Sequence, residues 1–398
     1  MQQKNLWLLP EGIEETLPDD AKHLERLRAK LLQTFECWGY ALVIPPFIDF
    51  LDSLLIGSGH DLDLQTFKLT DQISGELLGI RADMTPQVAR IDAHHLKHDA
   101  PNRLCYVGTV LHTRGDPLEK TRSPMQIGAE LYGHSGSDSD VEVIRLMLEM
   151  LSLTSLEQVH LDLGHVGIYR ALVAQAGLNP LQESQLFEVL QRKAKHELQD
   201  LLHSYQLEAH LTEQLLKLIE LNGAKEVLSQ ASVLFAEANE SVKQALADLT
   251  EIANNLSARF PHLTISFDLA ELRGYHYHTG VVFAAFIPTV GREIARGGRY
   301  DNIGAAFGRA RPATGFSADL KVLSALSKHN SAFNTPRERI FAPYAPADVS
   351  LAETIRVLRA QGHSVVEQLA GQTGGAADLA CNAQLELHQQ QWLVTALA

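Results

Sequence analysis

The 398-residue chain has the composition of an ordinary globular protein, with 45% hydrophobic and 21% charged residues, which excludes a collagen-like or extensively disordered chain. Its 34 Lys and Arg residues against 48 Asp and Glu residues give a formal net charge of −14, which argues against a general nucleic-acid binder or a membrane-surface protein. Its three cysteines form no Cys-x-x-Cys pair, which excludes a disulfide scaffold and a cysteine-built zinc site. With neither an apolar run of about 20 residues nor a signal-peptide pattern, we expect a cytoplasmic protein without a membrane partner.

Helical and strand-like patterns alternate through residues 1–165. Pro18 marks the start of a helix whose leucines recur at helical spacing, and Gly39 marks its end. Thr85 and Pro86 are predicted as the N-cap and first residue of a helix that runs to about Leu96. The other expected elements are a strand at 40–44, a hairpin of strands at 66–69 and 77–80, strands at 104–111, 125–132 and 160–163, and a helix at 138–153.

The pattern changes after residue 165. Residues 166–258 are rich in Leu, Gln, Glu and Ala at helical spacing, and we interpret them as an inserted helical subdomain. Strand patterns resume at 263–268, 281–286 and 292–295, and a helix begins at about Asp319. A polar linker at 327–337 then separates a first domain, 1–326, from a small α/β domain at 338–398. Because hairpin-joined strands with helices set apart are typical of antiparallel sheets, the first domain is predicted to be α+β.

Two polar clusters could bind a ligand. Asp83 and Thr85 lie two residues apart between an apolar strand and a helix, so both could face an ammonium group. Gln126, Gly128 and Glu130 share one face of a predicted strand, and the glycine leaves room for a ligand against the backbone. From these residues alone, a helix cap with a surface ion pair and a solvent-facing strand edge remain open alternatives.

Two further clusters lie later in the chain. Arg273 could bind a carboxylate with both arms of its guanidinium. His276 and His278 share a strand face, which could suggest a metal, but the sequence places no third ligand and we expect no metal. The glycines at 297–298 and Gly315 permit close backbone approach, either to a ligand or to a packed strand.

In this order, the clusters resemble the catalytic core of class II aminoacyl-tRNA synthetases, and the histidyl-tRNA synthetase type in particular. The helix–strand unit that ends at Pro46 is similar to the first class II motif, which builds the dimer interface in that family. Segments 81–85, 126–130, 273–280 and 298–301 resemble its histidine-pocket segments. The resemblance covers about residues 5–325 and implies a class II synthetase-like antiparallel sheet flanked by helices.

Departures from the synthetase pattern concern ATP and tRNA. His112 stands where the second class II motif has an arginine for the ATP α-phosphate, and Arg114 replaces the acidic partner of that arginine. Val322 stands where the third motif has a second ATP-binding arginine. Each lost charge-assisted contact costs about 2–5 kcal/mol, so we expect no amino-acid adenylation. The segment 330–398 holds four arginines and six carboxylates without a lysine, which is unsuited to RNA.

A histidyl-synthetase body that keeps an amino-acid pocket but lacks ATP and tRNA contacts resembles the regulatory subunits of ATP phosphoribosyltransferase, which acts first in histidine biosynthesis. This resemblance implies a non-catalytic subunit that binds the short catalytic subunit in a hetero-octamer, activates it and confers feedback inhibition by histidine. It also implies a homodimer, no cofactor and no nucleic-acid partner. The alternatives are an active histidyl-tRNA synthetase and an unrelated amino-acid-binding enzyme such as an amide ligase.

The family's pocket, transferred residue by residue, implies a histidine site and no catalytic residue. The α-ammonium group would be held by Asp83, Thr85 and Gln126. Glu130 would face the imidazole and Arg273 the carboxylate, while Tyr277 would line the site. His278 stands where the family has a tyrosine near the imidazole, so side-chain recognition is expected to be rearranged there.

Overall fold

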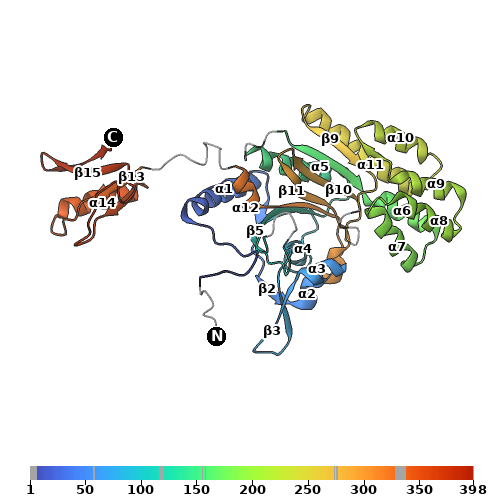
Figure 1. The fold of residues 1–398 in the computed structure, drawn as a ribbon, viewed down its shortest axis with the longest axis horizontal. Coiled ribbons are helices and arrows are strands. Elements are labelled where there is room, and N and C mark those ends of the chain that lie inside the picture. Colours follow the sequence, from blue (N-terminus) through green and yellow to red (C-terminus); the bar gives the residue numbers. More distant parts are fainter. Residues whose placement is uncertain are drawn as a thin grey trace. The chain divides into compact units, whose positions relative to one another are not determined.

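The computed structural model describes residues 7–56, 59–115, 121–154, 156, 158–272, 274, 277–327 and 338–397. The chain divides into two compact units, Met1–Asn330 and Ser331–Ala398 (Figure 1). Of the linker predicted at 327–337, only Ser327 belongs to the described residues. No helix within the described ranges is long and apolar enough to cross a membrane.

A nine-stranded sheet with the order β1-β5-β6-β12-β11-β10-β7-β9-β8 forms the base of the first unit. The strands are β1 (Ala41–Leu42), β5 (Asn102–Thr109), β6 (Met125–Tyr132), β12 (Ala313–Asp319), β11 (Val290–Arg299), β10 (Val281–Ile287), β7 (His160–His165), β9 (Thr264–Asp268) and β8 (Asn222–Gly223). β1 runs parallel to β5 and β7 parallel to β9, whereas the other neighbours are antiparallel. The predicted α+β fold with a mostly antiparallel sheet is therefore confirmed.

Three helices form a layer beside this sheet: α1 (Pro18–Cys37), α5 (Ser137–Ser152) and α12 (Leu320–Leu326). The predicted apolar face of α1 is buried, and Leu27, Leu31 and Phe35 expose no surface. The ring of Phe35 meets Phe316 of β12 edge-on, at 6.0 Å between centroids. Because burying one such side chain contributes about 1.5–3 kcal/mol, this layer fixes β12 and the neighbouring strand β6.

A smaller antiparallel sheet has the order β2-β4-β3, with β2 (Ile48–Phe50), β4 (Leu77–Ile80) and β3 (Phe67–Thr70). It confirms the predicted hairpin. The helices α2 (Leu51–Leu55) and α3 (Gly59–Gln65) lie between β2 and β3, α4 (Thr85–Arg90) follows β4, and a π-helix, η1 (Ile91–Leu96), continues α4. The prediction of Thr85 as the N-cap is wrong, because Met84 is the N-cap and the Thr85 hydroxyl donates instead to Glu130 at 3.2 Å.

The stretch after β7 is helical, as the composition predicts (Figure 1). Its helices are α6 (Val166–Ala176), α7 (Pro180–Gln191), α8 (Lys195–Tyr205), α9 (Ala209–Leu218), α10 (Glu226–Leu234) and α11 (Glu240–Arg259). α11 packs against α5 and α6, with Leu249, Ile252 and Leu256 fully buried. The two-residue strand β8 within this stretch pairs with β9. It was not predicted, because two residues are too few to show a strand periodicity.

Strand β11 is longer than the predicted segment 292–295 and continues through Gly297 to Arg299. The place of a Cβ on Gly297 is filled by the carbonyl oxygen of Gly315 and the ring of Phe283. At this position the glycine therefore serves the close packing of β10, β11 and β12. A short 3-10 helix, η2 (Ile303–Phe307), follows the strand.

The second unit has a four-stranded sheet in the order β14-β13-β15-β16. Its elements are β13 (Arg339–Ala342), α14 (Val349–Ala360), β14 (Ser364–Glu367), β15 (Ala383–His388) and β16 (Gln391–Ala396). β13 is parallel to β14 and β15, and β15 is antiparallel to β16. Leu351 and Ile355 of α14 pack onto Ile340 and Val365 of the sheet. The predicted α/β character of this segment is confirmed.

Candidate ligand pocket

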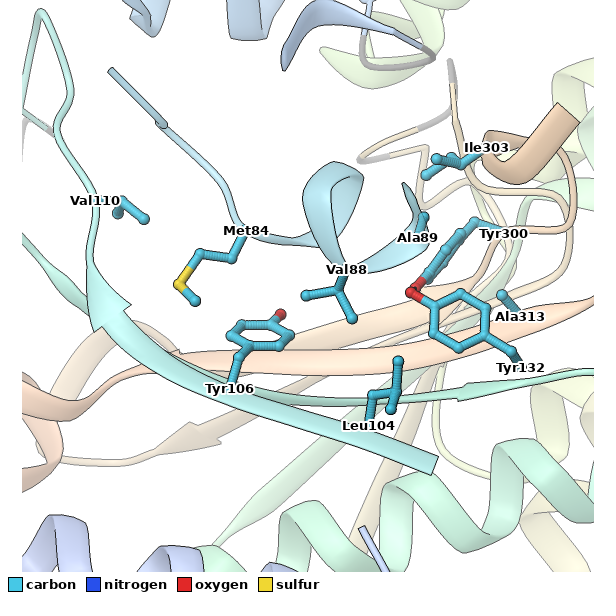
Figure 2. Packing of buried hydrophobic residues seen from close by; sticks show 10 residues of the cluster. All are labelled: Met84, Val88, Ala89, Leu104, Tyr106, Val110, Tyr132, Tyr300, Ile303 and Ala313. Atoms are coloured by element: carbon cyan, nitrogen blue, oxygen red, sulfur yellow. The ribbon is translucent and has the colours of Figure 1, made fainter. Parts of the chain in front are cut away.

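A buried carboxylate, Glu130, lies at the centre of the predicted site. It belongs to β6 and only 1% of its surface is exposed. One oxygen accepts hydrogen bonds from the hydroxyls of Tyr106 at 2.9 Å and Thr85 at 3.2 Å. The other oxygen accepts from the Tyr300 hydroxyl at 2.6 Å. Figure 2 shows the hydroxyls of Tyr300 and Tyr132 pointing toward one another, 3.1 Å apart, in the same apolar cluster as Tyr106.

Two glycines make room for this arrangement. Gly128 is paired with Tyr106 between β6 and β5, and a Cβ on Gly128 would lie 2.5 Å from the Tyr106 hydroxyl oxygen. Gly315 is paired with Glu130 between β12 and β6, and a Cβ there would lie 1.5 Å from a Glu130 oxygen. The space over Gly128, which the sequence suggested for a ligand, is thus filled by a tyrosine, while Gly315 admits the carboxylate itself.

Burial governs the protonation of this cluster. It raises the pKa of Glu130 to about 8, with the neighbouring charge of Asp83 adding to the rise and the three hydroxyl donors opposing it. Burial, with the charge of Glu130 next, also holds the pKa of Tyr106, Tyr132 and Tyr300 well above 10. The tyrosines therefore keep their protons at neutral pH and remain hydrogen-bond donors.

Asp83 and Gln126 lie together beside the start of α4. An oxygen of Asp83 accepts hydrogen bonds from the backbone N–H of Thr85 at 3.0 Å and from the Gln126 amide at 2.8 Å. The Gln126 side-chain oxygen accepts from the N–H of Met84 at 2.9 Å. These bonds orient the Gln126 amide and join β6 to the start of α4.

The site contains two carboxyl groups, Asp83 and Glu130, and no cationic side chain among the described residues pairs with them. A buried carboxylate without a counter-ion is costly, and a ligand with an ammonium group or ring N–H donors would remove that cost. The arrangement is therefore suited to a small cationic ligand with several N–H groups.

Tyr277 and His278 border the same cluster. Their rings lie 4.0 Å apart between centroids, and the Tyr277 ring lies 6.0 Å from that of Tyr300. His278 is buried, its Nδ1 lies 3.3 Å from the carbonyl oxygen of Arg299, and its ring occupies the space over Gly298. Burial lowers the pKa of His278 to about 4, so the ring is neutral at pH 7 and its Nδ1 donates to the carbonyl.

Of the predicted site, the structure brings together Asp83, Thr85, Gln126 and Glu130, with the two rings of 277–278 adjacent. Arg273, which was predicted to hold a ligand carboxylate, lies outside the described residues, as does His276. Within the described ranges, no group of three or more His, Cys, Asp or Glu side chains could hold a metal ion.

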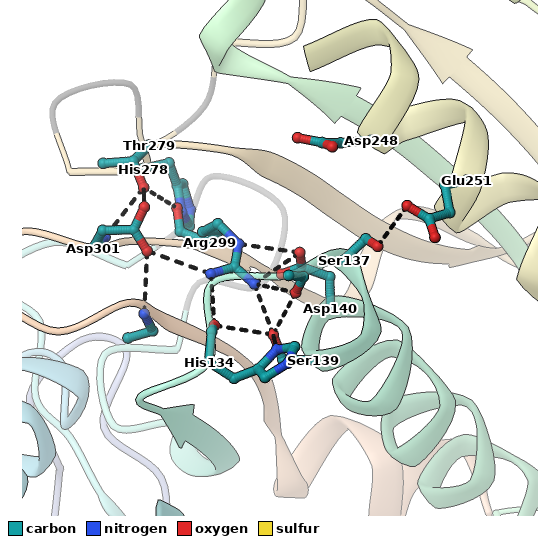
Figure 3. Close-up of polar contacts among 12 residues, drawn as sticks. His134, Ser137, Ser139, Asp140, Asp248, Glu251, His278, Thr279, Arg299 and Asp301 are labelled. Atoms are coloured by element: carbon teal, nitrogen blue, oxygen red, sulfur yellow. Dashed lines mark hydrogen bonds and ion pairs between the residues drawn. The ribbon is translucent and has the colours of Figure 1, made fainter. Parts of the chain in front are cut away.

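A buried ion pair supports the wall that carries His278 (Figure 3). The Arg299 guanidinium donates to a single Asp140 oxygen from Nε at 3.1 Å and from Nη2 at 2.9 Å, and to the His134 carbonyl oxygen at 3.1 Å. From α6, Arg170 donates to the carbonyl oxygen of His278 at 3.0 Å. The backbone that bears the pocket wall is thus held from both α5 and α6.

The two positions that bind ATP in the synthetase pattern, His112 and Val322, carry no guanidinium, and Lys321 is the neighbour of Val322. The Nε2 atom of His112 lies 2.9 Å from the carbonyl oxygen of Ala82, next to Asp83. Lys321 donates from Nζ to the carbonyl oxygen of Ser123 at 2.7 Å, and Val322 has no donor in its side chain. His112 therefore braces the segment that carries Asp83 instead of offering a guanidinium to a phosphate.

Sequence reasoning missed the tyrosines that hold Glu130. Tyr106 lies in the predicted strand 104–111 without a role, and Tyr300 lies in the segment 298–301 that resembles a histidine-pocket segment, but neither was predicted to contact Glu130. The signal available for Tyr106 was a bulky residue in one strand whose hairpin partner carries a central glycine, Gly128. The contact of Tyr300 with Glu130 could not be predicted. It depends on the strand order of the sheet, in which β12 lies between β6 and β11.

Comparison with known proteins gives two matching family models. One described as histidyl-tRNA synthetase matches residues 12–323, and one described as ATP phosphoribosyltransferase subunit HisZ C-terminal domain matches residues 337–395. Curated relatives named ATP phosphoribosyltransferase regulatory subunit include one from Methylococcus capsulatus, 56% identical over 98% of this chain and 96% of its own length. Another, from Thioalkalivibrio sulfidiphilus, is 56% identical over the whole of both chains.

Solved structures agree in fold. One from Bacillus halodurans, described as an ATP phosphoribosyltransferase regulatory subunit/histidyl-tRNA synthetase, has a TM-score of 0.82 and 29% identity, over 95% of this chain and 97% of that chain. The histidyl-tRNA synthetase from Nostoc has a TM-score of 0.76 and 16% identity, over 99% of this chain and 97% of that chain, and shows a shared fold alone.

Proposed function

Because this chain belongs to the family of ATP phosphoribosyltransferase regulatory subunits, we propose that it binds the short catalytic subunit, activates it and makes it sensitive to histidine. The chain is a regulatory subunit in histidine biosynthesis rather than an aminoacylating enzyme. The catalytic subunit as direct partner, the hetero-octamer and the histidine effector are parts of the proposal.

One observation carries the choice of effector: two carboxyl groups, Asp83 and Glu130, lie close enough for the charge of one to act on the other, without a cationic partner among the described residues. In the proposal, the histidine α-ammonium group donates to Asp83 and is surrounded by Thr85 and Gln126. The imidazole donates an N–H to Glu130. The ligand thereby supplies positive charge beside two carboxyl groups whose present hydrogen-bond donors are all neutral.

The rest of the proposed site closes around the ligand. Arg273 would bind the histidine carboxylate, as the family pattern implies, and the rings of Tyr277 and His278 would form the wall. Because His278 is neutral and already donates to the Arg299 carbonyl oxygen, it contributes shape rather than charge. Recognition of the imidazole then falls to Glu130 and the tyrosines around it.

Feedback requires that histidine bind one state of the complex better than another. A difference of about 1–3 kcal/mol between these states suffices for a useful response. The links from the pocket wall to α5 and α6 through Arg299 and Arg170 supply physical contacts through which occupancy could bias the neighbouring helices.

A homodimer is also proposed, through the segment that resembles the first class II motif. After α1, this segment and the residues that follow it through β2 expose large apolar side chains: Leu42, Ile44, Phe47, Ile48 and Phe50, each at least 41% exposed. Exposed apolar side chains that gather within one short segment are typical of a protein interface. A second copy, seated on the same segment by two-fold symmetry, would cover it.

The deciding experiment is a phosphoribosyl-transfer assay of the short catalytic subunit, with and without this chain, titrated with histidine. We expect a rate increase on adding the chain and inhibition by histidine. Asp83→Asn should weaken the inhibition about 10- to 100-fold and leave activation intact, whereas Asp71→Asn, on an exposed turn, should change neither. No effect of the chain on the rate would refute the proposal. Pyrophosphate exchange with ATP and histidine would instead favour an active histidyl-tRNA synthetase.

A further inference from the structure

A cavity lies apart from the Glu130 site described above. It has a volume of about 440 Å³ and is walled by the end of α1, strand β5, and helices α5 and α11, with Trp38, Arg103, Glu142, Arg145, Asn255 and Arg259 among its lining residues. Ligand sites for small molecules have volumes of about 300–1,000 Å³, so this cavity is large enough for a small metabolite.

Two of its arginines have no bonded carboxylate partner among the described residues, although the charge of Arg145 contributes to lowering the pKa of Glu142. The Arg145 guanidinium lies over the indole of Trp38, 5.1 Å from the ring centroid. Arg259 lies at the C-terminal end of α11 and is exposed. Within the described part of the chain, neither guanidinium forms an ion pair or a hydrogen bond. Stacking on the indole holds the Arg145 fork in place while leaving its N–H donors available.

The carboxylates of the cavity do not cancel this charge. Glu142 accepts hydrogen bonds from Arg103 on both of its oxygens, each at 2.7 Å, and from the Tyr40 hydroxyl at 3.1 Å. Asp138 is the other lining carboxylate, so three arginines against two carboxylates leave a net charge of +1. In a chain of net charge −14, a cationic hollow of this kind attracts anions locally.

The polar groups differ in what they can bind. Guanidinium forks match the paired oxygens of a phosphate or carboxylate. Asp138 would repel such an anion, but it can accept hydrogen bonds from hydroxyl groups, and the amide of Asn255 can both donate and accept. A ligand with a phosphate at one end and several hydroxyl groups at the other can bind the arginines with its phosphate and Asp138 and Asn255 with its hydroxyl groups.

We propose that this cavity is a binding site for a small sugar phosphate, with Arg145 and Arg259 on the phosphate and Asp138 and Asn255 on the hydroxyl groups. The site is separate from the proposed histidine pocket, and Trp38 in its lining belongs to the segment proposed above for the homodimer.

The test is calorimetric titration of the full-length protein with ribose 5-phosphate, in a low-salt buffer free of phosphate and sulfate. We expect saturable binding with a dissociation constant of about 1 mM or lower. Inorganic phosphate should bind more weakly because it lacks the hydroxyl groups, and ribose should give no saturable heat.

Variants separate the site from general charge. Arg145→Gln should weaken ribose 5-phosphate binding about 10- to 100-fold. Arg192→Gln removes the same charge from an exposed ion pair with Glu197 and should leave binding unchanged. Arg259→Gln, at an exposed position, gives a second test should Arg145→Gln fail to fold. The absence of saturable binding, an equal loss in Arg192→Gln, or equal affinity for inorganic phosphate would each overturn the proposal.

Discussion

Replacement of Glu130 by glutamine removes the buried charge while keeping the shape of the pocket. The glutamine carbonyl can still accept from the hydroxyls of Tyr106 and Thr85, and its amide can donate to the Tyr300 oxygen. Tyr300 can in turn donate to Tyr132, which lies 3.1 Å away. Glu130→Gln is therefore expected to fold with its hydrogen bonds satisfied, and the change isolates the electrostatic contribution of the carboxylate.

The size of that contribution follows from the pKa of Glu130, which burial raises to about 8 from an ordinary value of 4.5. Between these values the folded chain binds more protons than the unfolded chain, so the free energy of unfolding falls as the pH rises. The destabilisation by the buried charge is absent below about pH 4.5 and complete above about pH 8. Between about pH 5 and pH 8 the free energy of unfolding therefore falls by roughly 4 kcal/mol through this group.

Urea denaturation of the wild type and of Glu130→Gln at about pH 5, 6.5 and 8 measures this contribution. We expect the variant to gain stability relative to the wild type as the pH rises, by a few kcal/mol over the range. Groups that titrate identically in both proteins cancel in this difference. As a control, Glu76→Gln on the exposed β3–β4 turn should show a constant difference. A constant difference for Glu130→Gln as well would refute the reasoning.

Three further changes have defined outcomes. Arg299→Leu leaves a buried aspartate without its partner and should lower the free energy of unfolding by about 3–5 kcal/mol, whereas Arg192→Gln should cost less than about 1 kcal/mol in the same urea titration. Burial lowers the pKa of His165 to about 4, so the wild type loses stability as the pH falls from about 6.5 to 4. His165→Asn should reduce this loss by roughly 2 kcal/mol between pH 7 and pH 5, measured by urea denaturation at these two pH values. Gly315→Ala places a methyl group where the Glu130 carboxylate lies and should abolish histidine binding in calorimetry. Unchanged affinity would show that the Glu130 carboxylate lies elsewhere when the ligand is bound.

Much of the fold could be predicted because its elements carry strong local patterns. The hairpin of β3 and β4, the strand pair β5 and β6, and the apolar face of α1 follow periods of 2 and 3.6 that do not depend on distant residues. The extension of β11 through Gly297 could not be predicted in this way. Glycines suggest a turn in isolation, and their role in packing depends on the opposing β10 and β12.

The site shows the same division. The grouping of Asp83 with Gln126 was predicted from two short segments and a family resemblance. The hydrogen bond from the Thr85 hydroxyl to Glu130 could not be predicted. The two residues are 45 positions apart in the sequence, and only the folded sheet brings them together, whereas the sequence favoured a bond to the helix end. The same holds for Tyr300, which reaches Glu130 from 170 positions away.

The pairing of β8 with β9 changes how the helical stretch should be regarded. The chain passes from β7 into α6 without an intervening loop and returns from α11 into β9, and β8 then completes the edge of the large sheet. β8 pairs with Phe267 and Asp268, the last two residues of β9. Excising residues 166–258 would remove this pairing and lengthen the open edge of the sheet, which invites association with other chains, so a shortened version of the protein would be more prone to aggregate.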